Sequence, residues 1–165
     1  METIAVYFEP VAKSYGLHTV TGVVMVRTPL GFEPLPQSAR QVSSPAPPAG
    51  KFSFVMLQCE PDGTATLYAV APPEDIPAIL EAFGRHSAGD AMDAEIGMQP
   101  VEMVLFQGPH FYERYGIAAT ALEKLREKKA GLLLAGFSGS MAYLVVPDGT
   151  AESAKAALAE CFRLP

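Results

Sequence analysis

The segment Gln107–Gly116 combines glycines, aromatic residues and charged residues between a predicted strand and a predicted helix. The first amides of a helix have no partner within the helix, so the amides of Ile117 and Ala118 point toward this loop. A carboxylate placed there gains amide hydrogen bonds and the positive end of the helix dipole. Arg114 adds a charge-assisted bond, and Glu113 is placed to receive an ammonium group. The segment therefore predicts a site for an amino acid.

The candidate ligand-binding residues of this segment are Gln107, Gly108, His110, Glu113, Arg114, Gly116, Ile117 and Ala118. Gly116 belongs to the set because it lets a ligand approach the backbone closely. A competing interpretation is a subunit interface with three aromatic anchors, which are Phe111, Tyr112 and Tyr115. A third interpretation is an enzyme in which His110 works with Tyr112 or Glu113, and it requires these side chains to converge in a cleft with shifted titration.

Other catalytic and metal-binding patterns are weak. His18, His86 and His110 show no metal-ligand spacing among themselves or with the cysteines, so we expect no metal. Cys59 and Cys161 are interpreted as small apolar side chains. The chain has no phosphate-binding glycine loop. We therefore expect no catalytic residues and no cofactor.

Composition narrows the class of protein further. The chain has 165 residues, a formal net charge of −6 and 49% hydrophobic residues, which fits one domain or two small ones. The acidic balance argues against a nucleic-acid-binding face. No apolar run reaches the length of a membrane span, and the first residues lack a signal-peptide pattern. Two cysteines make a disulfide framework implausible and suit a reducing compartment. These features predict a cytoplasmic protein without nucleic-acid or membrane partners.

The sequence of the first half predicts strands, a proline-rich loop, a hairpin and a helix. Alternating and continuous apolar runs predict the strands, turn residues predict the hairpin, and prolines followed by acidic residues predict the helix start. Residues 29–50 hold six prolines and are expected to form a surface loop. The predicted elements are strands at 3–8, 17–28, 51–59 and 64–71, a helix from 72 to 84, and a weaker strand at 90–98.

The second half repeats this order. We expect strands at 101–106, 132–137 and 141–146, and helices at 116–129 and 151–162, with Thr150 as a helix cap. In the first of these helices Leu122 is expected to face inward. Each half ends with a strand, a strand and a helix, and the two closing phenylalanines are Phe83 and Phe162. The spacing indicates a duplicated α+β unit.

The second half resembles an ACT domain, specifically the regulatory ACT pair of aspartate kinases. The residues that carry the resemblance are Val104–Gly108, the helix start Gly116–Ala119, the turn Phe137–Ser140 and the closing helix 154–164. The match extends back over 64–83. Ser138 and Ser140 align with a serine-rich turn of the family that contacts the ligand or a neighbouring subunit, although a plain hairpin turn is the simpler interpretation. No kinase domain is present, so the resemblance implies no aspartate phosphorylation.

The resemblance implies an α+β fold made of two ferredoxin-like βαββαβ units with antiparallel sheets. We expect a first unit at 1–98, atypical because of the proline-rich loop, and a second unit at 99–165. The second unit lacks a fourth strand of its own, so strand 3–8 is expected to join it and the halves to exchange strands.

The function predicted from these features is non-catalytic. The chain is expected to bind a small amino acid or related metabolite at an interface between ACT units and to modulate a partner. The resemblance implies an amino-acid kinase or another biosynthetic enzyme as that partner. Exposed sheet edges favour a homodimer. The alternative is a dimerisation or interaction module that binds no ligand.

Overall fold

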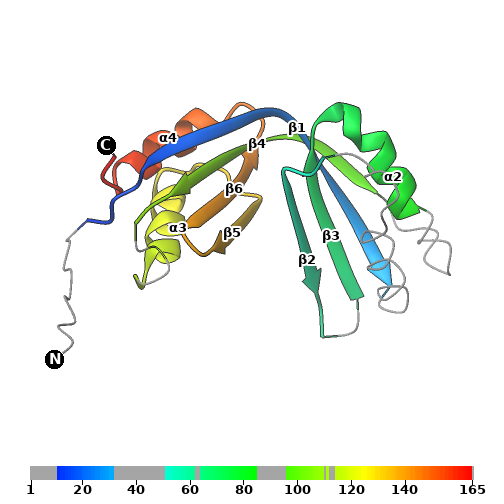
Figure 1. Cartoon of the computed structure of the whole chain (residues 1–165), viewed down its shortest axis with the longest axis horizontal. Helices are drawn as coiled ribbons and strands as arrows, with labels where there is room; N and C mark the ends of the chain where they lie inside the picture. The colour runs from blue at the N-terminus through cyan, green and yellow to red at the C-terminus, as the bar shows by residue number, and fades with distance from the viewer. Residues whose placement is uncertain are drawn as a thin grey trace. The chain divides into compact units, whose positions relative to one another are not determined.

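The computed structural model describes residues 11–31, 51–61, 64–84, 96–109, 111 and 114–164 of the chain. It is an α+β protein whose strands form a six-stranded sheet in the order β2-β3-β1-β4-β6-β5 (Figure 1). The elements in chain order are β1 (Gly16–Gly31), β2 (Phe54–Cys59), β3 (Thr64–Ala71), the short 3₁₀ helix η1 (Pro73–Asp75), α2 (Ile76–Gly84), β4 (Gly97–Gln107), α3 (Ile117–Glu127), β5 (Leu134–Ser138), β6 (Met141–Pro147) and α4 (Ala151–Ala159).

Contacts divide the chain into two compact units. The central unit is residues 22–101, and the terminal unit joins residues 1–21 to residues 102–165. Strands β1 and β4 therefore each run from one unit into the other. The boundary expected from the sequence, between residues 98 and 99, falls inside β4. The expected strand 3–8 lies outside the described residues, so its exchange between the units stays a prediction.

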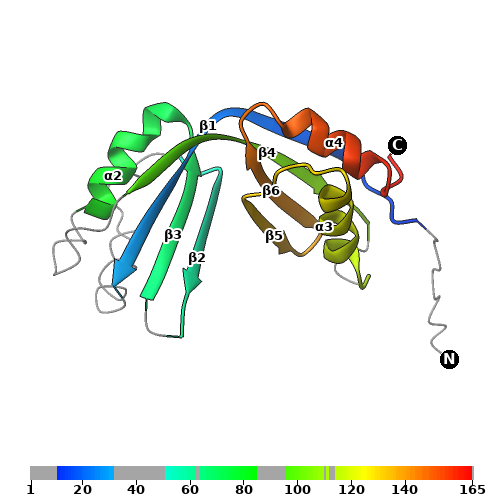
Figure 2. The same cartoon turned by 180° about the vertical axis from the view of Figure 1, so that it is seen from behind.

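The central unit is built around β3. This strand pairs antiparallel with β1, where Val24 lies opposite Ala71, and with β2, where Phe54 lies opposite Val70. Helix α2 covers one face of β1 and β3, as Figure 2 shows. The core of this unit is the cluster Val26, Leu67, Ala71, Ile76 and Ile79. Its strand residues follow a two-residue period and its helix residues, Ile76 and Ile79, a three-residue spacing, so both were recognisable in the sequence.

The terminal unit packs α3 and α4 against β4 and β6 (Figure 1). Buried side chains recur every second residue on the strands and every third or fourth residue on the helices. The core is the cluster Val104, Phe106, Phe111, Ile117, Ala121, Leu125, Ala142, Leu144, Val146, Ala151, Ala154, Ala157, Leu158 and Phe162. The many alanines on α4 let the helix backbone approach the sheet closely, because each carries only a methyl group.

Most predicted elements are confirmed, including the strand Thr64–Ala71 with the predicted bounds. Some expectations are wrong. Residues 29–31, expected in the proline-rich loop, form the end of β1, where Pro29 lies opposite Thr66. The last helix ends at Ala159 rather than at residue 162. Leu122 does not face the core but is 37% exposed. Thr150 holds the expected cap position, but its hydroxyl donates to the carbonyl of Pro147 at 2.6 Å and makes no cap bond.

Strand β4 is longer than expected at its start. It begins at Gly97 and includes Pro100. The sequence predicts two shorter strands instead, at 90–98 and 101–106, with a break at this proline. A proline is tolerated where its missing amide faces no ladder partner, which happens at a sheet edge or a bulge. Residues 32–50, most of the proline-rich loop, and residues 85–95 lie outside the described residues.

Helix α3 ends in a Schellman motif built on a residue other than glycine. The amide of Ala130 donates to the carbonyl of Leu125 at 2.9 Å, and the amide of Lys129 donates to that of Arg126 at 3.1 Å. Lys129 has φ 53°, the left-handed conformation that glycine adopts most easily. A non-glycine residue there costs about 1–2 kcal/mol, which places a small strain at this end of the helix.

We expect Lys129→Gly to raise the free energy of unfolding by about 0.5–1 kcal/mol, because relief of the strain exceeds the added chain entropy of the unfolded state. Urea unfolding followed by circular dichroism measures the change. The matched control is Glu123→Gly, an exposed position inside α3, where glycine should cost about 1 kcal/mol. A loss of stability in Lys129→Gly would contradict the prediction.

Candidate functional site

The candidate loop begins where β4 ends, and its first residues are tied to neighbouring segments by backbone hydrogen bonds. The carbonyl of Gln107 accepts from the amide of Tyr15 at 2.8 Å and from the hydroxyl of Ser14 at 3.0 Å. The amide of Gly108 donates to the carbonyl of Ser140 at 3.2 Å. The structure therefore brings together three of the predicted site residues, and it adds two residues that sequence reasoning missed, Ser14 and Tyr15.

The middle of the loop is anchored in the core by an aromatic side chain. Phe111 is 7% exposed and packs edge-on against Phe106, with ring centroids 5.7 Å apart. It also packs against Phe162, with ring centroids 6.0 Å apart. A buried ring cannot serve as an anchor for another subunit, so the interface interpretation is wrong for Phe111. Tyr115, in contrast, is fully exposed and keeps that role as a prediction.

The end of the loop leads into the open start of α3. Gly116 occupies the cap position with φ 89°, and no side chain of the described residues caps the helix. The first helical bond runs from the amide of Thr120 to the carbonyl of Gly116 at 2.8 Å. The amides of the three residues before Thr120 therefore lie outside the helical bonding pattern, at an exposed end of the helix. This geometry offers donors to an anion.

The start of α4 is built differently. The amide of its first residue, Ala151, donates to a carboxylate oxygen of Glu102 on β4 at 2.8 Å. An acidic side chain there satisfies an amide and complements the positive helix dipole. The protein thus places its own carboxylate at the start of α4, whereas none of the described residues places one at the start of α3. Sequence spacing gave no signal for Glu102, because the two residues are 49 positions apart.

The other predicted site residues differ in burial and position. Arg114 is partly buried, and the side chain of Ile117 is buried in the core, so only its backbone is suited to a ligand. Ala118 is partly buried beside it. Ser138 is exposed at the end of β5, opposite Met141, and reaches the loop only through the turn to Ser140. His110 and Glu113 lie outside the described residues and stay predictions.

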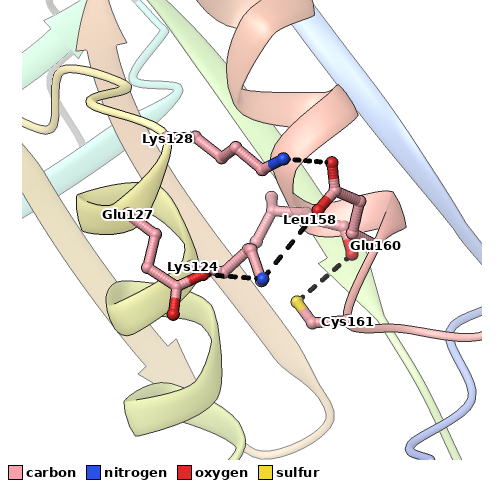
Figure 3. Close-up of polar contacts among 6 residues, drawn as sticks. All are labelled: Lys124, Glu127, Lys128, Leu158, Glu160 and Cys161. Carbon is pink, nitrogen blue, oxygen red and sulfur yellow. Dashed lines mark hydrogen bonds and ion pairs between the residues drawn. The ribbon is translucent and has the colours of Figure 1, made fainter.

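A second polar cluster joins the C-terminal ends of α3 and α4 (Figure 3). Lys124 pairs with Glu127 at 2.7 Å and lies 3.8 Å from Glu160, which also pairs with Lys128 at 2.5 Å. The bond from Lys124 lowers the pKa of the Glu127 carboxyl, and the same bond raises the pKa of the Lys124 ammonium. Exposed pairs of this kind add little to stability, because water screens their charges. The cluster joins α3 to Glu160, the residue that follows α4.

The thiol of Cys161 borders this cluster and donates to the carbonyl of Leu158 at 3.3 Å (Figure 3). Burial raises the pKa of this thiol, which opposes formation of the reactive thiolate. Cys59 is exposed on the edge strand β2. Within the described parts of the chain, no group of three acidic, histidine or cysteine side chains could hold a metal ion. No helix among those residues is long and apolar enough to span a membrane.

We expect Cys59 to react with an aromatic disulfide reagent at neutral pH roughly tenfold faster than Cys161, because a buried thiol with a raised pKa supplies little thiolate. Mass spectrometry of partly labelled protein measures the two rates. Unfolding in urea is the control and should bring the rates together. Faster labelling of Cys161 than of Cys59 in the folded protein would contradict the prediction.

Solved structures similar to this chain are regulatory parts of aspartate kinases. The regulatory subunit from Thermus thermophilus, in its ligand-free form, is 11% identical, has a TM-score of 0.73, and is matched over 93% of this chain and 99% of that chain. Aspartate kinase from Synechocystis is 14% identical with a TM-score of 0.74, over 95% of this chain and 28% of the enzyme. A putative C-terminal regulatory domain of aspartate kinase from Porphyromonas gingivalis is 10% identical with a TM-score of 0.63, over 90% of this chain and 96% of that one.

These comparisons concern the fold. No protein-family model and no curated protein matches the sequence. The matched structures cover this chain almost completely, so the chain has the fold of an aspartate kinase regulatory region. At the level of the fold, the predicted resemblance to regulatory ACT pairs and the predicted α+β class are confirmed.

Proposed function

We propose that this chain is a non-catalytic regulatory protein that binds a small amino acid, or a related metabolite, at the start of α3. The observation that carries the proposal is the uncapped, exposed helix start that follows the Gln107–Gly116 loop. A free carboxylate is the ligand group that such a helix start attracts, because it accepts amide bonds and opposes the positive dipole end. The likeness to aspartate kinase regulatory structures supports a regulatory role.

Each part of the ligand has a proposed partner. The carboxylate accepts from the amides of Ile117 and Ala118, and Gly116 presents no side chain that would obstruct it. Arg114 supplies positive charge beside the carboxylate. Glu113 receives the ammonium group, as the sequence predicts. The ligand is then held by both of its charged ends, which selects an amino acid over a simple acid.

The binding event acts on a partner through linkage. A ligand that binds one conformation of the protein better than another shifts the population toward that conformation, and the shift changes the affinity for anything else that distinguishes the two. We propose a homodimer, because β2 and β5 are sheet edges that another chain can pair with. The proposed partner is an amino-acid kinase or another biosynthetic enzyme, and the proposed ligand site lies at an interface between ACT-like units.

A ligand-free dimerisation module is the second candidate. It is favoured by exposed apolar side chains in the terminal unit, above all the fully exposed ring of Tyr115 beside the α3 start and the 38% exposed ring of Phe137 on the edge strand β5. Exposed aromatic side chains are common anchors of protein interfaces. Calorimetric titration with the twenty amino acids, with the oligomeric state followed by analytical ultracentrifugation, separates the two candidates. An intact dimer that gives no heat with any amino acid would favour the module.

Ala119→Glu tests the proposed ligand position directly. Ala119 is exposed in the first turn of α3, where an acidic side chain complements the dipole and should stabilise the protein by about 0.3–1 kcal/mol. The same charge repels a bound carboxylate and should weaken binding of the amino acid about tenfold at low salt. Calorimetry measures the affinity, and urea unfolding measures the stability.

The matched control is Ala119→Gln, which has the same shape without the charge. It should bind within about twofold of the unmodified chain, because the repulsion is absent. Equal affinities of the Glu and Gln variants would show that no carboxylate binds at the α3 start, and the proposal for this site would then be wrong.

A further inference from the structure

The first described residues of the chain run beside the candidate loop and the C-terminal end. Lys13 forms a parallel bridge with Arg163, made by the amide of Ser14 to the carbonyl of Arg163 at 2.9 Å and by the amide of Arg163 to the carbonyl of Ala12 at 2.9 Å. The next amide, that of Tyr15, donates to the carbonyl of Gln107 at 2.8 Å. We call residues 11–15 the clamp.

Ser14 is the centre of the clamp. It is 3% exposed and is one of the few buried polar side chains described. Its hydroxyl lies 3.0 Å from the carbonyl of Gln107 and 3.1 Å from that of Gly16, and its oxygen accepts from the amide of Gly16 at 3.3 Å. A buried hydroxyl with these partners costs free energy to displace, because each partner would otherwise be left unpaired. One side chain therefore joins the end of β4 to the start of β1.

The clamp also confines the next residue of the loop. A Cβ atom at Gly108 would overlap both the carbonyl oxygen of Lys13 and the ring of Phe111. Gly108 is thus held between the clamp on one side and the loop's own buried aromatic ring on the other. The loop cannot move at this point unless the clamp moves as well.

We propose that the clamp sets the conformation of the Gln107–Gly116 loop and that Ser14 is its positioning residue. The proposal rests on the proposed function, because it concerns regulation of the same site. Ser14 touches no ligand; it acts by keeping the loop in the conformation that presents the α3 start. When the clamp opens, the binding-competent fraction falls, and the apparent affinity falls by the same factor.

Ser14→Ala is the test variant, and Ser153→Ala, at an exposed position on α4, is the matched control. Amide hydrogen exchange is followed by NMR in the unmodified protein and both variants without any ligand. In Ser14→Ala we expect exchange at Tyr15, Gly108 and residues 114–116 to be roughly three- to tenfold faster, with α4 and β6 unchanged. Ser14→Thr restores the hydroxyl and should restore protection. A uniform rise over the terminal unit, or no rise at the loop, would overturn the proposal.

The affinity for an amino acid found in the calorimetric panel is measured next. Ser14→Ala should weaken it by the factor by which the binding-competent fraction falls, which the NMR spectra report as the population of the closed loop, while Ser153→Ala leaves it unchanged. An unchanged affinity in Ser14→Ala, together with a measurably smaller closed population, would overturn the clamp and leave the proposed function intact. If the unmodified chain binds no amino acid, the proposed function fails, and the exchange measurement still decides whether Ser14 positions the loop.

Discussion

The candidate site depends on the joint burial of three aromatic rings. Phe106 precedes the last residue of β4, Phe111 lies in the loop, and Phe162 follows α4. Their ring centroids are 5.1–6.0 Å apart, within the range of favourable aromatic pairs. Burying one such ring stabilises the fold by about 1.5–3 kcal/mol. The end of β4, the loop that follows it and the distant segment after α4 are therefore fixed together before any ligand binds.

The contrast between the two helix starts of the terminal unit gives the site its chemical meaning. Both helices pack on the same sheet face and contribute to one core, so their starts face the same physical problem of unpaired amides. At α4 a carboxylate of the protein, that of Glu102, solves it. At α3 the cap is a glycine with a positive φ, which has no side chain to offer. The bond at α4 supports the proposal that the start of α3 accepts a carboxylate.

The sequence predicted the elements well where a single period dominates. Strand β3 alternates cleanly and was located to the residue, and the glycine before α3 marked the start of that helix. The start of β4 was missed because Pro100 breaks the local pattern although it is tolerated in the strand. Leu122 was placed inward from helical spacing alone, which cannot tell the centre of an apolar face from its flank.

The site was predicted only where its signal is local. The loop, the glycine cap and the open amides follow from neighbouring residues, so Gln107, Gly108 and Gly116 could be selected from the sequence. Ser14 could not be, because its bond to Gln107 spans 93 residues and goes to a backbone carbonyl that carries no sequence signal. Such partners depend on which strands lie side by side. That arrangement is a property of the whole fold.

The position of Ser14 shows how the ends of the two long strands are held together at the candidate site. The described site residues all belong to the terminal unit. The two strands that continue from it into the central unit are β1 and β4, and they meet at one hydroxyl: β1 begins at Gly16 and β4 ends at Gln107, and Ser14 bonds to both carbonyls. Strands are stiff along their length because each residue is held by ladder bonds. Because both strands are stiff, the hydroxyl of Ser14 holds the start of one and the end of the other together beside the candidate loop.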